Sequence, residues 1–427
     1  MSSRRSSLIS RRNFLRVGGA AGLGLSMVLR QSAWAAETPK ARNVVMIFLT
    51  GGPATIDMWD MKPESAESIR GEFRPRETSV PGIQICEHMP HLARSMHLAT
   101  LVRSVTHSIA EHTQGTSYLM TGNRPNPATE YPSLGSLSAR LLDDSEGTPP
   151  YMAIGDVPSS GAGDLGAVFN PFALAAQGSS GGPQSSERIG LPEGFTVTDL
   201  ERRAKVLARL DRQRAAFEAA DLPRQLDRYQ RRAIDILRSD RINKALDLEQ
   251  ETPELRARYG TSGFGRSALA SRRLLEAGAR FVTIGLGDWD THNNNFSRLK
   301  DNLLPQLDRG LAALITDLEE RGMLQETIVY CTGEFGRTPS VNGSAGRDHW
   351  AHTMTALVAG GNLPRGFVYG ATDGDCVDPT DAPCSPDDLS ATLFAQLGFP
   401  PDQQVLDRTG RPIPLFRSGH VLKGLVG

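Results

Sequence analysis

The chain has 427 residues, a size usual for one large or two to three ordinary domains, and its 39% hydrophobic content can bury a substantial core. With 22% charged residues, 43 glycines and 27 prolines, the composition predicts long loops and excludes wholesale disorder. The formal net charge is -1, but the first 35 residues hold six arginines and no acidic residue, so the remainder carries -7. That remainder has no excess of basic residues with which to bind phosphate groups, which argues against a nucleic-acid partner.

Residues 1–35 predict an export signal. A charged segment containing Arg11-Arg12 precedes the apolar stretch Val17–Leu29, and small residues follow at Ala33–Ala35. The paired arginines followed by Phe and Leu resemble the twin-arginine signal, so we expect export of a folded protein by the twin-arginine machinery to the periplasm or beyond. The alternative is a membrane anchor, but 13 residues span only about 20 Å of a bilayer core of about 30 Å. We therefore expect no stable membrane anchor.

Six short apolar runs in the remaining chain predict strands. They are Val44–Leu49, Leu98–Val105, Tyr151–Ile154, Phe281–Leu286, Thr327–Thr332 and Met354–Ala359. Near-continuous apolar runs suit a parallel sheet with both faces covered. Helical spacing of apolar residues predicts helices over Ser267–Ala277 and Leu299–Arg321, each followed by a glycine. The pattern predicts one doubly wound α/β domain over residues 43–427, with a mostly parallel sheet flanked by helices.

Two segments interrupt this alternation. Residues 156–194 are rich in Gly, Ser and Pro and predict a loop. Residues 197–258 are charged and rich in arginine and predict an inserted helical pair. This insertion could cover a site, set substrate choice or pair with another subunit, and a solvated structural insertion is the default interpretation.

Two of the four cysteines, Cys376 and Cys384, share one loop rich in Asp and Pro. They are close enough to form a disulfide in an oxidising compartment, and two free thiols are the alternative. Cys331 lies in an apolar run, where a buried and inert thiol is expected.

Chemically useful side chains collect next to three of the predicted strands. The segments are Gly287–His292, Gly333–Thr338 and Gly346–Thr353, and each contains Asp, Glu or His. In sheets of this kind ligands bind at the carboxyl ends of strands. Carboxylates and imidazoles are also ligands for divalent cations. The three segments therefore predict a metal site at one edge of the sheet.

Within these segments, Asp288 and His292 match the Asp-x-x-x-His pair of the alkaline phosphatase superfamily, which includes sulfatases and cofactor-independent phosphoglycerate mutases. In that superfamily the pair binds one metal, an Asp-His pair after the next strand binds a second, and a later histidine completes the first site. Glu334 and Phe335 stand where the Asp-His pair is expected, and His352 follows in Ala-His-Thr. The resemblance implies an alkaline phosphatase-like fold.

The sequence also departs from that superfamily. The first predicted strand ends without the expected metal-binding aspartate, which leaves Asp57 or Asp60 as displaced substitutes. The nucleophile position falls near His112 and Thr113. Thr113 could attack an ester if a metal lowered the pKa of its hydroxyl, and His112 could be a metal ligand or a proton donor. Since Phe335 replaces a histidine, the site is either reduced to one metal or rebuilt with other residues.

A closer resemblance covers several longer motifs. The segments Gly51–Asp57, His107–Gly122, Thr332–Pro339 and Gly346–Trp350 resemble the domain of unknown function 1501 family. Those are exported bacterial proteins, frequently with twin-arginine signals, and they are related to the sulfatase and phosphatase superfamily. The family has no settled substrate, so this resemblance identifies relatives better than it identifies an activity.

Together, the resemblances imply a metal-dependent hydrolase of phosphate or sulfate esters outside the cytoplasm. One or two divalent cations would be held by six candidate ligands: Asp57, Asp288, His292, Glu334, His349 and His352. Thr113 or water would attack, and Arg337 would neutralise the charge that develops on the ester oxygens.

Two questions stay open at this stage. Histidines with carboxylates suit zinc or manganese, whereas carboxylates with Asn293 or Asn294 and fewer histidines would admit calcium. The second question is whether the protein is an enzyme. The alternative is a binding or assembly protein that keeps the fold but has lost the nucleophile and the aspartate of the first strand.

Overall fold

The computed structural model describes residues 41–142, 147–175 and 239–426, together with Arg202. The expected export signal over residues 1–35 lies outside the described residues, as does most of the expected helical insertion over residues 197–258. Among the described residues, no helix has both the length and the apolar character needed to cross a membrane.

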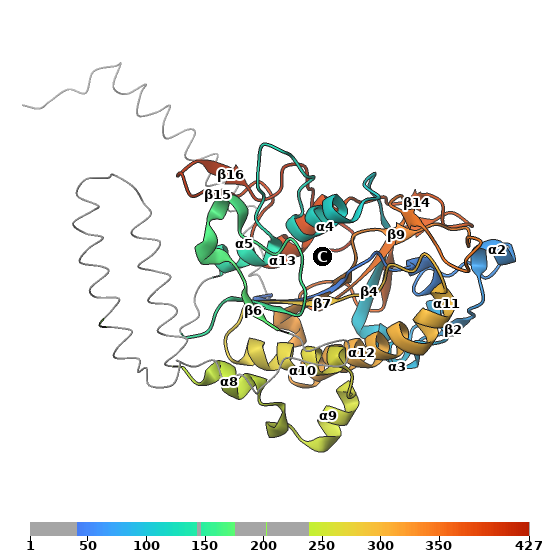
Figure 1. Ribbon diagram of the computed structural model, residues 1–427, viewed down its shortest axis with the longest axis horizontal. Coiled ribbons are helices and arrows are strands. Elements are labelled where there is room, and N and C mark those ends of the chain that lie inside the picture. Colours follow the sequence, from blue (N-terminus) through green and yellow to red (C-terminus); the bar gives the residue numbers. More distant parts are fainter. Residues whose placement is uncertain (1–40, 143–146, 176–201, 203–238, 427) are drawn as a thin grey trace, which may run out of the picture. The chain divides into compact units, whose positions relative to one another are not determined.

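A central sheet of eight strands runs in the order β12-β4-β11-β8-β1-β7-β5-β6 (Figure 1). Its members are β1 (Asn43–Leu49), β4 (Ala99–Val105), β5 (Tyr151–Ile154), β6 (Phe172–Leu174), β7 (Phe281–Leu286), β8 (Thr327–Thr332), β11 (Met354–Ala359) and β12 (Phe367–Tyr369). All six predicted strands are present. The two that the sequence did not predict, β6 and β12, are edge strands of three residues each. Since β6 falls within residues 156–194, the prediction that this whole segment is loop is wrong.

The strand directions decide which residues meet at one edge. β1 runs parallel to β7 and β8, and β5, β6, β4 and β12 point the same way. β11 runs antiparallel to both of its neighbours, β4 and β8. The residues just before β11 therefore lie at the same edge as the residues just after β7, β1 and β8.

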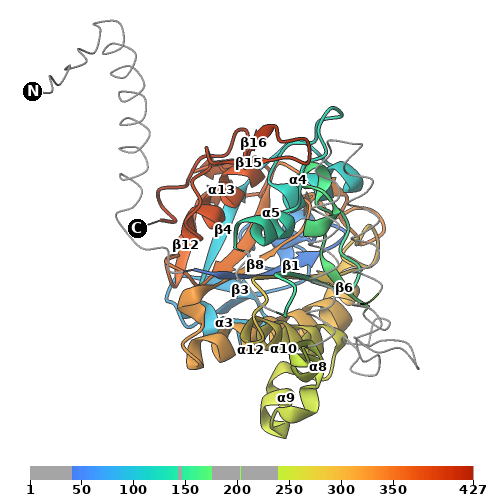
Figure 2. The same ribbon diagram turned by 90° about the vertical axis from the view of Figure 1, so that its left-hand side faces the viewer.

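Both faces of the sheet are covered, as its apolar strands predict. Successive residues of a strand point to opposite faces, and in β1 Val45 and Ile47 join one hydrophobic core while Met46 and Phe48 join the other. Figures 1 and 2 show the two helical layers. One layer contains α3 (Pro90–Ser95), α8 (Arg241–Leu246), α9 (Pro253–Tyr259), α10 (Gly263–Glu276) and α12 (Leu304–Glu320). The other contains α4 (His112–Thr121), α5 (Leu134–Leu141) and α13 (Pro386–Gln396). The protein is therefore a doubly wound α/β domain.

The predicted helix over residues 299–321 is present with a different beginning. A π-helical turn, Leu299–Leu303, follows the short α11 (Asn295–Arg298) and leads into α12. Pro305 lies in the first turn of α12 and has no N–H to donate to the preceding helical residues, which fits the break in the regular α-helical hydrogen-bond pattern at this point. The helix ends before Gly322, which has a φ of 71° and closes the helix as the sequence predicts.

Smaller elements complete the fold. They are α2 (Glu67–Arg70) and four two-stranded ribbons: β2 (Pro75–Glu77) with β3 (Gln84–Cys86), β9 (Gly336–Arg337) with β10 (His349–Trp350), β13 (Ala371–Thr372) with β14 (Pro379–Asp381), and β15 (Gln404–Leu406) with β16 (Pro412–Pro414). The β9-β10 ribbon pairs Arg337 with His349 and so joins two of the predicted site segments.

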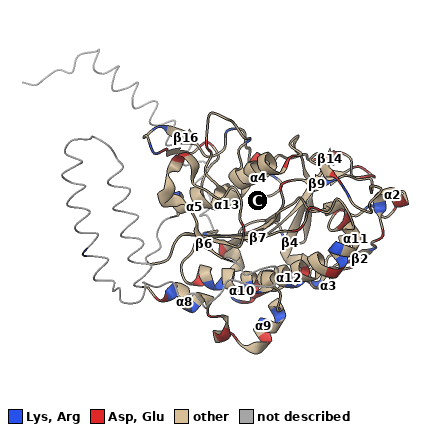
Figure 3. Ribbon diagram, viewed as in Figure 1, with Lys and Arg blue, Asp and Glu red and all other residues tan. Residues whose placement is uncertain are grey.

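The described end of the expected insertion is tied into the helical layer. Arg272 of α10 is fully buried and forms ion pairs with Glu251 at 2.9 Å, Glu276 at 2.6 Å and Asp317 at 3.0 Å. Basic and acidic residues are interspersed along these helices (Figure 3). Residues 239–258 thus include packed structure, and α8 contributes Ile242 to the core.

All four cysteines are free and buried. Cys376 lies near Asp60, with 3.6 Å between sulfur and carboxylate oxygen, and Cys384 lies near the Ser104 hydroxyl at 4.0 Å. Of the two alternatives for Cys376 and Cys384, the structure has the free thiols. Cys331 is fully buried in β8, and burial raises the pKa of its thiol, so the sulfur is protonated as an inert thiol.

Candidate metal centre

The turn after β1 passes between the loops that follow β7 and β8. Gly51 has a φ of 114°, and a Cβ there would lie 2.4 Å from the Asp290 backbone nitrogen. Gly52 has a φ of 73°, and a Cβ there would lie 2.6 Å from the Phe335 ring. Only glycine combines this backbone conformation with so close an approach. The Gly51 N–H also donates to Glu334 Oε1 at 2.8 Å, so all three loops are fixed together.

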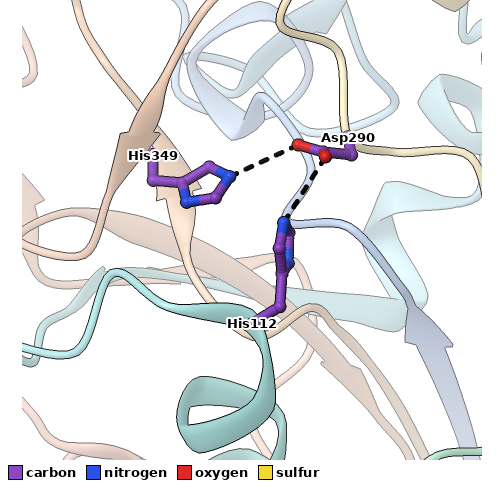
Figure 4. A group of neighbouring side chains, drawn as sticks. All are labelled: His112, Asp290 and His349. Carbon is purple, nitrogen blue, oxygen red and sulfur yellow. Dashed lines mark hydrogen bonds and ion pairs between the residues drawn. The ribbon is translucent and has the colours of Figure 1, made fainter.

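Three side chains from separate segments meet above this turn. The ligand atoms of His112, Asp290 and His349 all lie within 4.8 Å of one another (Figure 4). Asp290 Oδ2 is 3.4 Å from His112 Nε2, and Asp290 Oδ1 is 3.4 Å from His349 Nε2. His292 joins them, with its Nε2 at 3.1 Å from Asp290 Oδ1. We call these four residues the Asp290 cluster.

The three imidazole rings of the Asp290 cluster are held in orientation by hydrogen bonds at their Nδ1 atoms. Each Nδ1 faces an oxygen acceptor: Glu334 Oε1 at 2.7 Å from His112, Asp348 Oδ1 at 2.6 Å from His292, and Ala110 O at 3.0 Å from His349. An Nδ1 that donates to such an acceptor carries the proton, so the Nε2 of the neutral ring presents a lone pair. This is the arrangement that holds metal-binding histidines in known metal sites.

The Nε2 atoms of His292 and His349 are only 2.9 Å apart. Two lone pairs at this distance repel each other unless a proton or a cation lies between or beside them. A divalent cation ligated by both rings and by Asp290 satisfies all of these atoms at once. The residues present therefore fit a metal ion.

The electrostatics of the Asp290 cluster favour the ligating protonation states. Burial alone would raise the pKa of Asp290, but the hydrogen bond and charge of Arg337 bring it below the ordinary value. Burial lowers the pKa of His349, which keeps its ring neutral. The hydrogen bond from His292 lowers the pKa of Asp348. Since metal ligands must be deprotonated, the shifts of Asp290 and His349 lower the pH at which protons displace the metal.

Phe335 forms an apolar base beneath two of these rings. It is fully buried, and its ring centroid lies 5.1 Å from that of His112 and 4.6 Å from that of His349. A phenyl ring offers no ligand atom, so this position cannot supply the ligand to a second metal that a histidine would. The Asp290 cluster contains the one group of three metal-ligating side chains found among the described residues.

A family model described as "Protein of unknown function (DUF1501)" matches residues 41–426. The chain belongs to the DUF1501 family. No curated protein matches the sequence of this DUF1501 protein.

Solved structures that align with most of the DUF1501 chain have low sequence identity and low TM-scores. A sulfatase, PsFucS1, from Pseudoalteromonas sp. has 12% identity and a TM-score of 0.40, with 86% of this chain and 72% of that chain covered. The alkaline phosphatase of the Antarctic bacterium TAB5 has 11% identity and a TM-score of 0.34, with 80% and 96% covered. A protein in the alkaline phosphatase superfamily from Vibrio parahaemolyticus has 12% identity and a TM-score of 0.37, with 85% and 67% covered.

Asp57, which the sequence predicted to be a metal ligand, is instead a structural residue in this DUF1501 protein. Its carboxylate is buried and receives two hydrogen bonds of 2.7 Å from Arg347, one to each oxygen. The Asn295 side chain donates a third at 2.8 Å. With both oxygens engaged by an arginine that is itself fully buried, Asp57 has no free atom for a cation.

Arg337 is likewise engaged within the protein. Its guanidinium is buried and donates to the backbone carbonyls of Gly51, Gly52 and Arg347, and to the carboxylate of Asp290. An arginine whose donors face carbonyl oxygens cannot also bind the oxygens of an ester. We therefore correct the expected role: Arg337 positions Asp290 and the turn after β1.

Asp288 and His352, both expected as metal ligands, lie outside the Asp290 cluster. Asp288 is exposed at a φ of 74°, and it is Asp290, two residues later, that enters the cluster. His352 lies half exposed, with its Nδ1 3.0 Å from Asp378 Oδ1 and its ring against Trp350. Neither Asp288 nor His352 belongs to the group that can hold a metal among the described residues.

Glu334 contacts the Nδ1 of His112 and is not one of the metal-ligating side chains grouped around Asp290. Its Oε1 accepts hydrogen bonds from His112 and Gly51, and its fully buried Oε2 has no hydrogen-bond partner among the described residues.

Thr113 follows His112 in the first turn of α4 and is exposed. Its backbone N–H donates to Glu111 Oε1 at 2.9 Å, so Glu111 caps the helix.

The sequence predicts the segments that form the centre, but two residues that shape it, Asp290 and Asp348, were not predicted. Asp290 was visible as the second carboxylate of Gly287–His292, and only the backbone conformation at Asp288 decides between them. Asp348 immediately precedes His349 in the sequence, yet it orients His292, 56 residues away. A carboxylate next to a candidate ligand is the signal that could have pointed to Asp348.

Proposed function

We propose that this protein is a metal-dependent hydrolase of phosphate or sulfate esters, with one divalent cation bound at the Asp290 cluster. The observation that carries the proposal is the convergence of three imidazole Nε2 atoms on one carboxylate, with every Nδ1 fixed by an acceptor. Three imidazoles and a carboxylate suit zinc or manganese better than calcium, which prefers oxygen ligands. The twin-arginine-like leader supports action outside the cytoplasm.

A bound divalent cation supplies Lewis-acid polarisation of the ester oxygen and favours deprotonation of the attacking group. The protein's own contribution is orientation. Glu334 and Asp348 keep the histidine rings in place, and Arg337 holds Asp290 against the turn after β1. Thr113 at the start of α4 is the proposed nucleophile, and water is the alternative.

The test is turnover of para-nitrophenyl phosphate and para-nitrophenyl sulfate with zinc or manganese added. We expect His349→Ala to lose at least about 100-fold in kcat/KM, because it removes a ligand, whereas loss of an outer partner costs 10- to 100-fold. His352→Ala is the matched control and should retain wild-type turnover. If both variants turn over like the wild type, the proposed centre is not catalytic. Thr113→Val separates the nucleophiles, since it abolishes turnover only if Thr113 attacks.

One observation favours a second candidate, a non-catalytic binding or assembly protein. The Arg337 guanidinium donates to backbone carbonyl oxygens. The Glu111 carboxylate accepts the backbone N–H groups of Thr113 and Gln114 at the start of α4. Two groups suited to binding an ester anion are thus already engaged. In that case metal would raise the melting temperature, but no ester would be hydrolysed.

A further inference from the structure

The charges around the Asp290 cluster leave no surplus of positive charge for a substrate. Asp290 is one of three carboxylates there, because Glu334 and Asp348 each hold a histidine ring of the cluster. The guanidinium of Arg337 contacts the Asp290 side chain and supplies one positive charge. Three carboxylates and one guanidinium leave two negative charges, which one divalent cation balances.

The loop after β7 does not change this balance. Arg298 donates to the backbone carbonyls of Asp288 and Asp290 at 2.7 and 3.0 Å, so its guanidinium is fixed to that loop. Asp288 adds an exposed carboxylate to the same loop, and its charge offsets that of Arg298. A bound ester therefore brings negative charge to a site that is at best neutral with its metal ion.

Glu111 adds a further negative charge next to the cluster. It lies between two residues that belong to the site: the Ala110 carbonyl faces His349 Nδ1 at 3.0 Å, and the next residue is His112. His112 begins helix α4 and points toward Asp290 (Figure 4). The backbone on both sides of Glu111 is thus fixed to the cluster.

The carboxylate of Glu111 occupies the start of α4. One of its oxygens accepts the Thr113 N–H and the other accepts the Gln114 N–H, both at 2.9 Å. The first N–H groups of a helix carry partial positive charge and ordinarily bind the oxygens of an anion such as phosphate. In this protein a carboxylate of the chain itself takes that place, so an ester at the cluster receives no hydrogen bond from these two groups.

These charges distinguish esters by the charge that each ester carries. A phosphate monoester carries nearly two negative charges at pH 8, because its second pKa is about 6. A sulfate monoester and a phosphate diester carry one. Two like charges about 6 Å apart near a protein surface repel by enough to change a binding constant about tenfold. The second charge of a phosphate monoester is therefore unfavourable beside Glu111 and Asp348.

We propose that the site is selective for singly charged esters, which are sulfate monoesters and phosphate diesters, and that Glu111 disfavours the doubly charged phosphate monoesters. This inference rests on the proposed function, which positions the ester at the Asp290 cluster. Overall, hydrolysis adds one water across the ester bond: the bond from sulfur or phosphorus to the alcohol oxygen breaks, and one to the oxygen of the water forms. The alcohol leaves protonated, and the acid product then loses a proton. Its added charge favours release from the site.

The first test is calorimetric titration of the zinc-loaded protein at pH 8 with methyl sulfate, dimethyl phosphate and methyl phosphate, which needs no turnover. A metal ion alone favours the more highly charged anion, so the opposite order would come from the protein. We expect methyl phosphate to bind at least about tenfold more weakly than the two singly charged anions. Methyl phosphate binding as tightly as the others, or no binding of any of them, would overturn the proposal.

Variants at the start of α4 test the role of Glu111. Glu111→Gln removes the charge, Glu111→Ser removes it but keeps a favoured N-cap residue, and Glu111→Asp keeps both charge and cap. We expect the first two to reduce the discrimination against methyl phosphate about tenfold, and Glu111→Asp to preserve it. Glu254→Gln is the matched control, since it removes an exposed carboxylate from the first turn of α9 in the other helical layer. Unchanged discrimination in Glu111→Gln and Glu111→Ser, or an equal change in Glu254→Gln, would refute the role of Glu111.

Hydrolysis distinguishes the two sources of a singly charged ester and separates this inference from the proposed function. The substrates are para-nitrophenyl sulfate, bis(para-nitrophenyl) phosphate and para-nitrophenyl phosphate. Turnover of the first assigns sulfate monoesters, and turnover of the second assigns phosphate diesters. A kcat/KM that is highest for para-nitrophenyl phosphate would refute the inference and support the proposed function. Selective binding of the singly charged anions without hydrolysis of any ester would refute the proposed function and leave the charge selectivity standing.

Discussion

At the scale of single residues, two aspartates near the same sheet edge have opposite roles because their arginine neighbours differ. Arg347 contacts both oxygens of Asp57 in a fully buried pair. Arg337 contacts Oδ1 of Asp290, whose side chain is 44% exposed, while Oδ2 faces His112. A carboxylate that keeps one oxygen on an open face can still bind a cation, whereas a fully paired one cannot.

The Asp57–Arg347 pair makes a stability prediction. Asp57→Ala leaves the fully buried Arg347 charge uncompensated, which costs about 3–5 kcal/mol for a buried pair. Asp378→Ala removes an exposed partner of His352 and should cost less than about 1 kcal/mol. Urea unfolding of the two variants measures both values. Similar, small losses would show that the buried pair contributes little.

His107 predicts a pH dependence. Burial lowers its pKa from 6.5 to about 4, and its Nδ1 accepts the Ile109 N–H while its Nε2 donates to the Glu334 carbonyl. Between these pKa values the unfolded chain binds more protons than the folded chain, so stability falls as the pH falls from 6.5 towards 4. From pH 7.5 to pH 5 this amounts to about 2 kcal/mol.

His107→Gln should remove that part of the pH dependence, whereas His420→Gln, at a side chain that is 88% exposed, should not. Urea unfolding at the two pH values measures it. A His107→Gln variant with the wild-type pH dependence would contradict the assignment of the effect to His107.

At the scale of elements, the turn after β1 holds the loops after β7 and β8 in place. Both Gly51 and Gly82 have positive φ, 114° and 82°, but a Cβ at Gly82 would meet nothing within 4 Å. The pair therefore separates backbone strain from close approach. Gly82→Ala should cost about 1–2 kcal/mol from strain alone. Gly51→Ala should cost about 2–5 kcal/mol, because overpacking adds to the strain.

Thermal and urea unfolding of the two alanine variants, with metal content measured in parallel, test this prediction. Gly51→Ala should also bind less metal, since its Cβ would displace the backbone of Asp290. Equal stability losses in the two variants would mean that the loop after β7 can move aside without cost.

The elements also show what the sequence could predict. Six strands were found because each is a mostly apolar run, and the helix α10 because its apolar spacing is regular. The antiparallel direction of β11 could not be predicted, because an apolar run carries no direction. The edge strands β6 and β12 are too short for a pattern, and the π-helical turn Leu299–Leu303 preserves helical periodicity closely enough to be hidden.

At the scale of the whole molecule, the centre exists only because the topology brings distant segments to one edge. His112 follows β4, Asp290 and His292 follow β7, and His349 precedes the reversed strand β11. The sequence predicted this gathering from strand ends. It could not predict the choice of Asp290 over Asp288 or the engagement of Asp57 and Arg337, since loop conformation and tertiary pairing decide those.

Elemental analysis of bound metal in the purified wild type, Asp290→Asn and Asp288→Asn tests the Asp290 cluster most directly. Asparagine tolerates the positive φ of residue 288, so the control should stay folded. We expect about one zinc or manganese per chain in the wild type and in Asp288→Asn, and a loss of most of it in Asp290→Asn. Metal that persists in Asp290→Asn but is lost in Asp288→Asn, or a folded wild type without metal, would contradict the Asp290 cluster as the metal centre.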